Sequence, residues 1–339
     1  FMSNSLEFSG SIAFRQSLVA CSGQVDSNEQ YLFTGVMDLK KIAVIQDLPG
    51  LGKCSLTAAI PVISVMGVQA VPLPTAVLSN QTGYPSYYAC DYTGHMEKVM
   101  DEWEKLGFAP DGIYTGFLAD EKQADKILDF FRRFRGPDTM VLVDPVMGDN
   151  GSAYGIYTEG LQKKMLQLAD CAQVITPNLT EALLLLYGKA EMEESYASLM
   201  ALTGEKRLEM IGKIGKEMAE RFHLQAAVIT GIEYEKNSQG MTVSTGKKEA
   251  QTQMGNLVVE NGALSWYFAR KEGGSYSGTG DLFASVLSAG LVRGMSMIDC
   301  VKLAVDFLSK AISETVKEGT DRNDGVCFEK YLGELCKKK

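Results

Sequence analysis

Short apolar runs alternate along the chain with longer segments of helical spacing, and this alternation constrains the fold more than any other feature. The clearest run, Met-Val-Leu-Val at 140–143, is closed at once by Asp144 and Pro145. Continuous apolar runs of this kind are typical of strands buried on both faces of a parallel sheet. Strands that alternate with helices favour a sheet covered by helices on both faces. We therefore expect an α/β fold of three layers, α/β/α, around a mostly parallel central sheet.

The other expected elements follow from the same pattern. Strands are predicted at 41–46, 68–73, 112–115, 140–144, 172–176 and 226–230. Helices are predicted at 55–66, 95–106, 121–134 and 160–168, then up to about 222, and finally at 278–293 and 296–318. Residues 74–93 are predicted to form a polar loop. Short runs at 241–244, 256–259 and 264–268, separated by turn residues, predict a hairpin at the sheet edge.

The same pattern favours a single domain over residues 39–339, without an internal repeat or a linker. Residues 1–38 match none of the expected elements, and Phe1 stands before Met2. We interpret this stretch as an N-terminal extension or a cloning remnant that is poorly ordered. Met37 is then a candidate for the natural start.

The charge balance limits the partners. The chain has 42 Asp and Glu against 33 Lys and Arg, a net charge of -9. A nucleic-acid-binding protein would turn a basic face towards phosphates, so no nucleic-acid partner is expected. No apolar run reaches the length that a bilayer requires, so no membrane partner is expected either.

Cysteine and histidine usage limits the chemistry. The seven cysteines are widely spaced without a Cys-x-x-Cys pair, which argues against a disulfide framework or a zinc site and favours a reduced, cytoplasmic protein. The two histidines, His95 and His223, lie far apart in sequence and offer little for a histidine-based triad. If the chain is an enzyme, its general base is expected to be a carboxylate.

Several predicted strands end in polar or turn residues. These ends are Gln46-Asp47, Thr115-Gly116, Asp144-Pro145, Thr176-Pro177-Asn178 and Thr230-Gly231. In an open α/β sheet, ligands bind outside the carboxyl ends of the strands. As a set, these residues predict a ligand crevice along that edge, whereas each one alone is equally typical of a strand-ending turn.

The segment 273–283, Gly-Gly-Ser-Tyr-Ser-Gly-Thr-Gly-Asp-Leu-Phe, carries the most specific signal. Bare amides at the start of a helix form an anion hole, and glycine lets a phosphate approach the backbone. Asp281 would lie in the first helical turn, where a carboxylate could take the proton of a hydroxyl aimed at phosphate. Its placement is explained as well by the preference of the helix dipole for an acidic residue.

The chain resembles the pyridoxal kinase branch of the ribokinase superfamily. Its motifs are Gly-Thr-Gly-Asp-Leu-Phe-Ala at 278–284, Leu-Ser-Asn-Gln-Thr-Gly-Tyr at 78–84, Asp-Pro-Val-Met-Gly-Asp at 144–149, and Thr-Pro-Asn at 176–178 with Glu181. They stand in the family's order, and the resemblance runs from about residue 41 to the C-terminal helix. It implies a ribokinase-like fold in which residues 254–276 include a lid over the nucleotide.

The resemblance also implies a reaction, in which ATP and Mg²⁺ phosphorylate the 5′-hydroxymethyl group of a vitamin B6 vitamer. Asp281 would be the general base, and the Gly278, Thr279 and Gly280 amides would stabilise charge on the transferred group. ATP would meet Asn178, Thr230, Gly278 and Gly280. Asp144 and Glu181 would serve the metal, partly through water. The substrate ring would meet Asp47, Ala76, Leu78, Thr82 and Phe117. A monovalent cation is a further candidate cofactor, and a homodimer is the expected assembly.

Two departures from the family pattern leave the substrate open. Asp47 stands where the family has a serine, and Gln81 stands where it often has a histidine. Asp47 could bind a protonated ring nitrogen or an amino group, which favours pyridoxamine or the hydroxymethylpyrimidine of thiamine synthesis; it could equally cap the following loop. The alternatives are therefore a hydroxymethylpyrimidine kinase and a non-catalytic B6-binding protein.

Overall fold

A mostly parallel sheet forms the centre of the fold, as the alternation of strands and helices predicts. The computed structural model describes residues 39–236 and 251–336. In these residues nine strands pair in the order β11-β10-β9-β8-β5-β4-β1-β2-β3. The inner strands from β9 to β2 are parallel, whereas β10, β11 and β3 extend the sheet by antiparallel pairing.

The strands of this sheet are β1 (Lys41–Leu51), β2 (Gln69–Asn80), β3 (Ala89–Asp91), β4 (Gly112–Thr115), β5 (Met140–Val143), β8 (Val174–Ile175), β9 (Ala226–Lys236), β10 (Gln251–Glu260) and β11 (Ala263–Arg270). A separate small hairpin joins β6 (Gly148–Asp149) to β7 (Ser152–Ala153).

The helices are α1 (Ser55–Val65), α2 (Thr93–Lys105), α3 (Glu121–Phe134), α4 (Glu159–Cys171), α5 (Leu179–Ala201), α6 (Gly204–Arg221), α7 (Thr279–Val292), α8 (Met297–Glu318) and α9 (Leu332–Leu335). Two short 3-10 turns, Arg322–Asp324 and Glu329–Tyr331, lie between α8 and α9.

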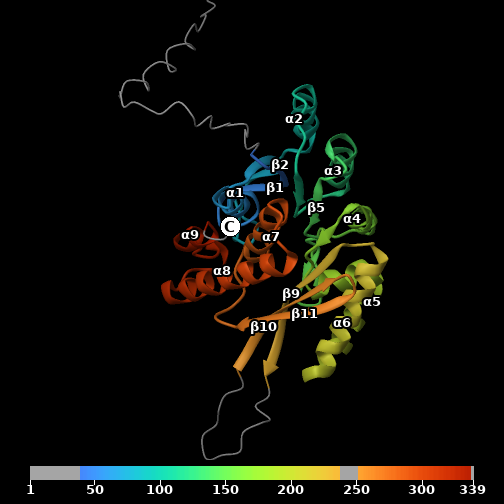
Figure 1. Cartoon of the computed structure of the whole chain (residues 1–339), viewed down its shortest axis with the longest axis vertical. Coiled ribbons are helices and arrows are strands. Elements are labelled where there is room, and N and C mark those ends of the chain that lie inside the picture. The colour runs from blue at the N-terminus through green and yellow to red at the C-terminus, as the bar shows by residue number, and fades with distance from the viewer. Residues whose placement is uncertain (1–38, 237–250, 337–339) are drawn as a thin grey trace, which may run out of the picture. The chain divides into compact units, whose positions relative to one another are not determined.

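The helices cover both faces of the sheet and complete the three layers (Figure 1). One face packs against α2 to α6, and the other packs against α1, α7, α8 and α9. Strand side chains alternate between the two cores: Ala43 and Ile45 of β1 enter the first, Ile42 and Val44 the second. This double burial explains why the inner strands read as continuous apolar runs.

The predicted loop at 74–93 is wrong over its first part. β2 continues to Asn80, and β3 pairs with it from Ala76 to Leu78. The prolines at 72 and 74 are tolerated because β3 does not reach them, so no ladder hydrogen bond is lost on that side. Beside β2, β1 also runs beyond Gln46 to Leu51, with an irregularity between Gln46 and Leu48.

Two details of α1 are unusual. Ser55 does not cap the helix: Cys54 occupies that position, and Ser55 itself has a φ of 48°, a left-handed value that is uncommon outside glycine. Pro61 neither starts nor ends the helix, which continues through it to Val65.

The edge hairpin is confirmed by β10 and β11, whose strands pair across an Asn261-Gly262 turn. The expected strand at 241–244 and the N-terminal extension at 1–38 lie outside the described residues. Within residues 39–236 and 251–336, no helix has the length and apolar character needed to cross a membrane.

Candidate active site

The start of α7 lies against the loop that follows β1. Gly278 precedes the helix with a φ of 83°, which suits glycine, and a side-chain carbon added to it would collide with the Lys53 carbonyl oxygen. Gly278 therefore serves close backbone packing, and glycine at 278 and 280 leaves the first α7 amides unobstructed by side chains at these positions. An anion can approach such amides.

Asp281 lies in the first turn of α7, as predicted. Desolvation by the surrounding protein raises the pKa of its carboxyl group to about 6, an effect opposed by the Ser55 amide and increased by the Asp47 charge. A carboxylate with this pKa is deprotonated at neutral pH and binds a proton more strongly than an exposed aspartate does. It is thus suited to act as a general base.

Asp144 follows β5 and lies close to the start of α7. Its Oδ1 accepts a hydrogen bond from the Thr176 hydroxyl at 3.1 Å, and its Oδ2 lies 3.7 Å from the position of a side-chain carbon on Gly280. Burial raises the pKa of Asp144 to about 8, and the nearby charge of Asp281 contributes to this rise. The β5 end and the α7 start therefore bring two carboxyl groups together in a poorly solvated place.

Asn178 and Glu181 form a capping box at the start of α5. The Asn178 side chain accepts from the Glu181 amide at 3.0 Å, and the Glu181 carboxylate accepts from the Asn178 amide at 2.8 Å and the Met147 amide at 3.2 Å. Burial, followed by the Asp144 charge, raises the pKa of Glu181 well above its usual value. Thr230 lies beside them, since it forms a parallel bridge with Asn178.

Asp47 lies on β1, near Asp281, and is 5% exposed. Burial raises its pKa, and the Ser55 hydroxyl lowers it. Asp47 and Asp281 also influence each other electrostatically. The structure thus gathers Asp47, Asp144 and Asp281 at the carboxyl ends of β1 and β5 and the start of α7.

The other expected substrate residues occupy two places. Ala76 and Leu78 lie on β2, where Leu78 pairs with Pro49 of β1, and Thr82 follows in an exposed turn. Phe117 follows β4 and is half-buried. No hydrogen bond or ring contact links these four side chains to Asp281 within the described part of the chain.

The C-terminal segment 322–329 contacts this region, which the sequence did not indicate. Gln81 is 7% exposed, and its side chain donates to the Asn323 side chain at 2.9 Å and accepts from the Gly83 amide at 2.7 Å. Lys53 pairs with Glu329 at 2.9 Å. The two residues of the Gln81–Asn323 contact, like those of the Lys53–Glu329 ion pair, lie more than 240 residues apart in the chain. No sequence motif identifies either pair.

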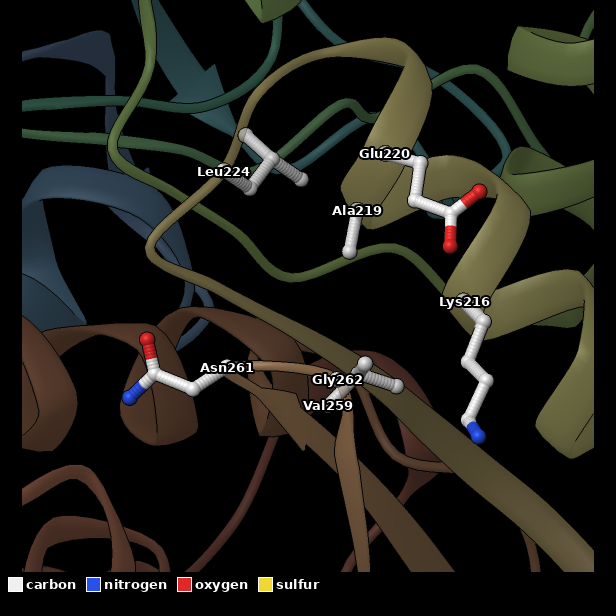
Figure 2. A pocket seen from close by; sticks show the side chains of 7 residues that line it. All are labelled: Lys216, Ala219, Glu220, Leu224, Val259, Asn261 and Gly262. Carbon is white, nitrogen blue, oxygen red and sulfur yellow. The ribbon is translucent and has the colours of Figure 1, made fainter.

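Two surface pockets lie beside β9 and α6, towards opposite ends of the strands. One borders Asn178 and Gly231 and includes the charged side chains of Asp149, Arg207 and Glu233. The other lies between α6 and the β10–β11 turn, where Lys216, Glu220 and Asn261 surround it (Figure 2). Glu260 pairs with Ala226 at the beginning of β9, so this second pocket is far from the carboxyl ends of the strands.

The site offers few protein ligands for a metal ion. No group of three or more His, Cys, Asp or Glu side chains is arranged to hold a metal among residues 39–236 and 251–336. Mg²⁺ commonly takes only one or two carboxylates and completes its shell with phosphates and water. Asp144 fits this demand because its Oδ2 faces the α7 start, whereas both Glu181 oxygens are occupied by amides.

Comparison with known proteins agrees with this geometry. The sequence profile of the phosphomethylpyrimidine kinase family matches residues 55–325. A pyridoxine/pyridoxal/pyridoxamine kinase of Bordetella avium is 25% identical over 299 residues, which cover 86% of this chain and 90% of that protein.

Solved structures are also similar. A Bacteroides thetaiotaomicron protein, provisionally described as a phosphomethylpyrimidine kinase and crystallised with pyridoxal, is 33% identical with a TM-score of 0.74, covering 88% of this chain and 96% of that one. A Lactobacillus plantarum pyridoxal kinase is 25% identical with a TM-score of 0.71, covering 88% of this chain and 96% of that one.

Proposed function

The chain belongs to the phosphomethylpyrimidine kinase family and is an ATP-dependent small-molecule kinase of the ribokinase superfamily; from this premise we propose that it phosphorylates the 5′-hydroxymethyl group of a vitamin B6 vitamer, with Mg²⁺. The observation that carries the proposal is Asp281, a partly desolvated carboxylate in the first turn of a helix whose glycine-flanked amides can receive a phosphoryl group.

Each group at the α7 start has a distinct role in this proposal. The Asp281 carboxylate takes the proton of the substrate hydroxymethyl group as the hydroxymethyl oxygen attacks the γ-phosphorus of ATP. The bond between the γ-phosphorus and the bridging oxygen breaks, and ADP leaves. The amides of residues 278–280 stabilise the charge on the transferred phosphoryl group. Asn178 follows β8 and forms a bridge with Thr230, which lies within β9 because that strand continues past the predicted end at Gly231 to Lys236. From these positions both residues can meet the ATP phosphates.

The metal role divides between two carboxylates. Asp144 holds Mg²⁺ through its Oδ2, and the ion supplies positive charge against the phosphates when it is bound. Glu181 acts indirectly, because its two oxygens hold the amides of Asn178 and Met147 and so fix the loop after β5. The proposal leaves a monovalent cation as an optional addition.

The substrate ring is proposed to bind between Asp47 on β1 and the β2 segment that carries Ala76 and Leu78, with Thr82 and Phe117 at its margin. The support for Asp47 is its buried carboxyl group beside the base. Such a group favours a substrate that offers a donor, either a protonated ring nitrogen or an amino substituent.

A hydroxymethylpyrimidine kinase is the second candidate. Two observations favour it, namely the family description and Asp47, which suits the amino group of a pyrimidine as well as it suits a pyridine donor. The base, the anion hole and the metal site keep the same roles in that reaction. A non-catalytic B6-binding protein has no use for a base beside a phosphate site, so it ranks third.

The test is ATP-dependent phosphorylation of pyridoxal, pyridoxine, pyridoxamine and hydroxymethylpyrimidine in the presence of Mg²⁺. We expect turnover of at least one B6 vitamer, and we expect Asp281→Asn to lower kcat by about 10²- to 10⁴-fold while ATP affinity changes little. Asp306→Asn, on the exposed side of α8, is the matched control and should keep full activity.

The outcomes separate the candidates. Turnover of the pyrimidine alone would replace the substrate and retain the mechanism. Binding of a vitamer without turnover would favour the binding protein. Normal turnover by Asp281→Asn would remove Asp281 from the reaction.

The proposal includes a homodimer. Its support is a set of exposed apolar side chains, namely Leu51 of β1, Val77 of β2, and Tyr87 and Tyr88 in the segment that leads into the edge strand β3. Apolar surface gathered at a sheet edge is typical of contact sites. Light scattering that gives the mass of one chain at micromolar concentration would rule this assembly out.

A further inference from the structure

A short turn near the C-terminus lies against three segments of the candidate site. We call it the C-terminal turn and define it as residues 321–325, which include the 3-10 helix Arg322–Asp324. It contacts the turn after β2, the loop after β1 and the residue that leads into α7. All three segments are distant from it in sequence, so only folding brings them together.

The Gln81 side chain connects the turn after β2 to the C-terminal turn. Its Nε2 donates to Asn323 Oδ1 at 2.9 Å and to the Asn323 carbonyl oxygen at 3.3 Å, while its Oε1 accepts from the Gly83 amide at 2.7 Å. A backbone amide can only donate, so the contact with Gly83 fixes which end of the Gln81 amide faces Asn323. Asn323 must then offer acceptors, and both of its contacting atoms are oxygens.

Two glycines fit closely around the Gln81–Asn323 contact. A side-chain carbon on Gly83 would lie 2.6 Å from Asn323 Oδ1, and one on Gly52 would lie 2.8 Å from Gln81 Cγ. Both distances are well below the usual carbon contact distance of about 3.5 to 4.0 Å. The contact is therefore part of the close packing of two loops around a side chain that is only 7% exposed.

A second contact holds the other end of the same turn. The Tyr84 hydroxyl donates to the Asp324 carboxylate. The C-terminal turn is itself held by Asp321, whose Oδ1 accepts from the Asn323 amide at 2.8 Å. Thr82, which we propose to lie at the margin of the substrate ring, thus stands between two residues that the C-terminal turn holds.

The C-terminal turn reaches the start of α7 through backbone atoms. The Arg322 carbonyl oxygen accepts from the Ser277 amide at 3.1 Å. Gly325 packs against Lys53, whose carbonyl oxygen lies against Gly278. A change of side chain at residue 323 leaves these backbone groups in the chain, so its effect on the substrate side can be separated from any effect on the phosphate side.

We propose that Asn323 is a positioning residue, which acts through Gln81 to hold residues 81–84 in the conformation that receives the substrate ring. Asp324 supports the same conformation through Tyr84. This inference rests on the proposed function, because the ring is that of the proposed substrate. A turn that is already ordered in the free protein need not be ordered on binding, so its ordering cost is removed from the binding step. Asn323 therefore acts on substrate affinity rather than on the chemical step.

The kinetic test begins with Asn323→Ala, which removes the side-chain acceptor. We expect KM for the best substrate to rise about 5- to 10-fold, with kcat and KM for ATP changing by less than about twofold, because the loss weakens the ground state and the transition state alike. Asn323→Asp keeps an acceptor for Gln81 and should restore most of the affinity. Asn261→Ala, in the β10–β11 turn, is the matched control for loss of a turn asparagine and should leave KM unchanged.

A double variant tests whether Asn323 acts through Gln81. In a Gln81→Ala background, we expect Asn323→Ala to raise KM no further, because the partner of its acceptor is already missing. If the two changes raised KM independently and their effects multiplied, the proposed route through Gln81 would be overturned.

Hydrogen exchange of the full chain tests the ordering apart from activity. We expect the amides of residues 81–84 to exchange about tenfold faster in Asn323→Ala, and at the wild-type rate in Asn261→Ala. Unchanged exchange, or faster exchange with an unchanged KM, would overturn the positioning role in a protein that phosphorylates a vitamer. Equal losses of kcat, substrate affinity and ATP affinity would show that Asn323 serves only folding. Faster exchange in a chain that turns over neither a vitamer nor the pyrimidine would uphold the ordering of this turn and reject the proposed function.

Discussion

At the scale of single residues, the site is dominated by carboxyl groups whose environments differ. Asp281 has a pKa of about 6 and Asp144 a pKa of about 8, in both cases chiefly because burial disfavours the charged form. A base must be charged before the reaction and must bind a proton during it, which suits Asp281. Asp144 becomes charged readily only when a cation approaches, which suits a metal ligand.

The pKa of Asp281 sets a pH dependence. Because it is raised to about 6, the base is increasingly protonated as the pH falls through 6, and we expect kcat/KM to fall tenfold per pH unit below that value. The measurement is kcat/KM for the best vitamer between pH 4.5 and 9 at saturating Mg²⁺ and ATP. A profile that stays flat down to pH 5 would contradict the assignment of Asp281 as the base.

At the scale of elements, the loop after β1 and the start of α7 depend on each other. Gly278 has a left-handed conformation and lies against the Lys53 carbonyl, and Gly325 packs against Lys53 from the C-terminal segment. The amides of α7 are thus positioned by backbone contact, which a side chain would disturb. The proposed anion hole therefore depends on this packing as well as on the helix.

Gly278→Ala tests the packing. A residue other than glycine in the left-handed region costs about 1 to 2 kcal/mol, and at this position the new carbon also meets the Lys53 carbonyl. We expect a larger loss of unfolding free energy than this conformational cost alone, together with weaker binding of ATP. Urea unfolding and titration calorimetry measure the two effects.

The matched control is Gly319→Ala at the end of α8. Gly319 has a φ of 65°, but nothing lies within 4 Å of the added carbon. We expect this variant to lose about 1 kcal/mol of stability and to bind ATP normally. Equal losses of stability in the two variants would show that the contact with Lys53 contributes little.

At the scale of the whole molecule, the buried carboxyl groups of the site lower the free energy of unfolding at neutral pH. Asp47, Asp144, Glu181 and Asp281 all have raised pKa values in the folded state. A carboxyl group of this kind stabilises the fold fully below its unfolded pKa, near 4, and this contribution is lost as the pH rises through its folded pKa. At neutral pH, where the unfolded chain carries these groups in their charged forms, folding must therefore either protonate them or bury their charge, and both lower the stability of the nucleotide-free protein.

Asp144→Asn should reveal this cost. For Asp144 the loss takes place between about pH 4 and pH 8, so the variant should melt higher than the wild type at pH 8, on the order of 5 °C, and by much less at pH 5. Differential scanning calorimetry without nucleotide measures this difference, with Asp306→Asn as the charge-matched control. If Asp144→Asn raised the melting temperature equally at pH 5 and pH 8, buried charge at Asp144 would not be the source of the gain in stability.

The sequence by itself determined the layer order and the position of Asp281, the proposed base. Local patterns were enough to predict both features. Strands buried on both faces must be apolar throughout, and the Gly-Thr-Gly-Asp segment marks a helix start with exposed amides. The three-layer fold and the placement of Asp281 in the first turn of α7 are confirmed. The strand ends at Asp144 and Asn178 were also located correctly, since each follows a buried run.

Only the tertiary structure decided which of these residues meet. The extension of β2 through Pro74 was missed because its neighbours, not its own composition, provide the hydrogen bonds. The Gln81–Asn323 contact joins elements distant in the chain, and no local pattern records such a pair. The pKa of Asp281 likewise depends on how deeply folding buries it beside Asp47, because desolvation is a property of the assembled site rather than of any segment.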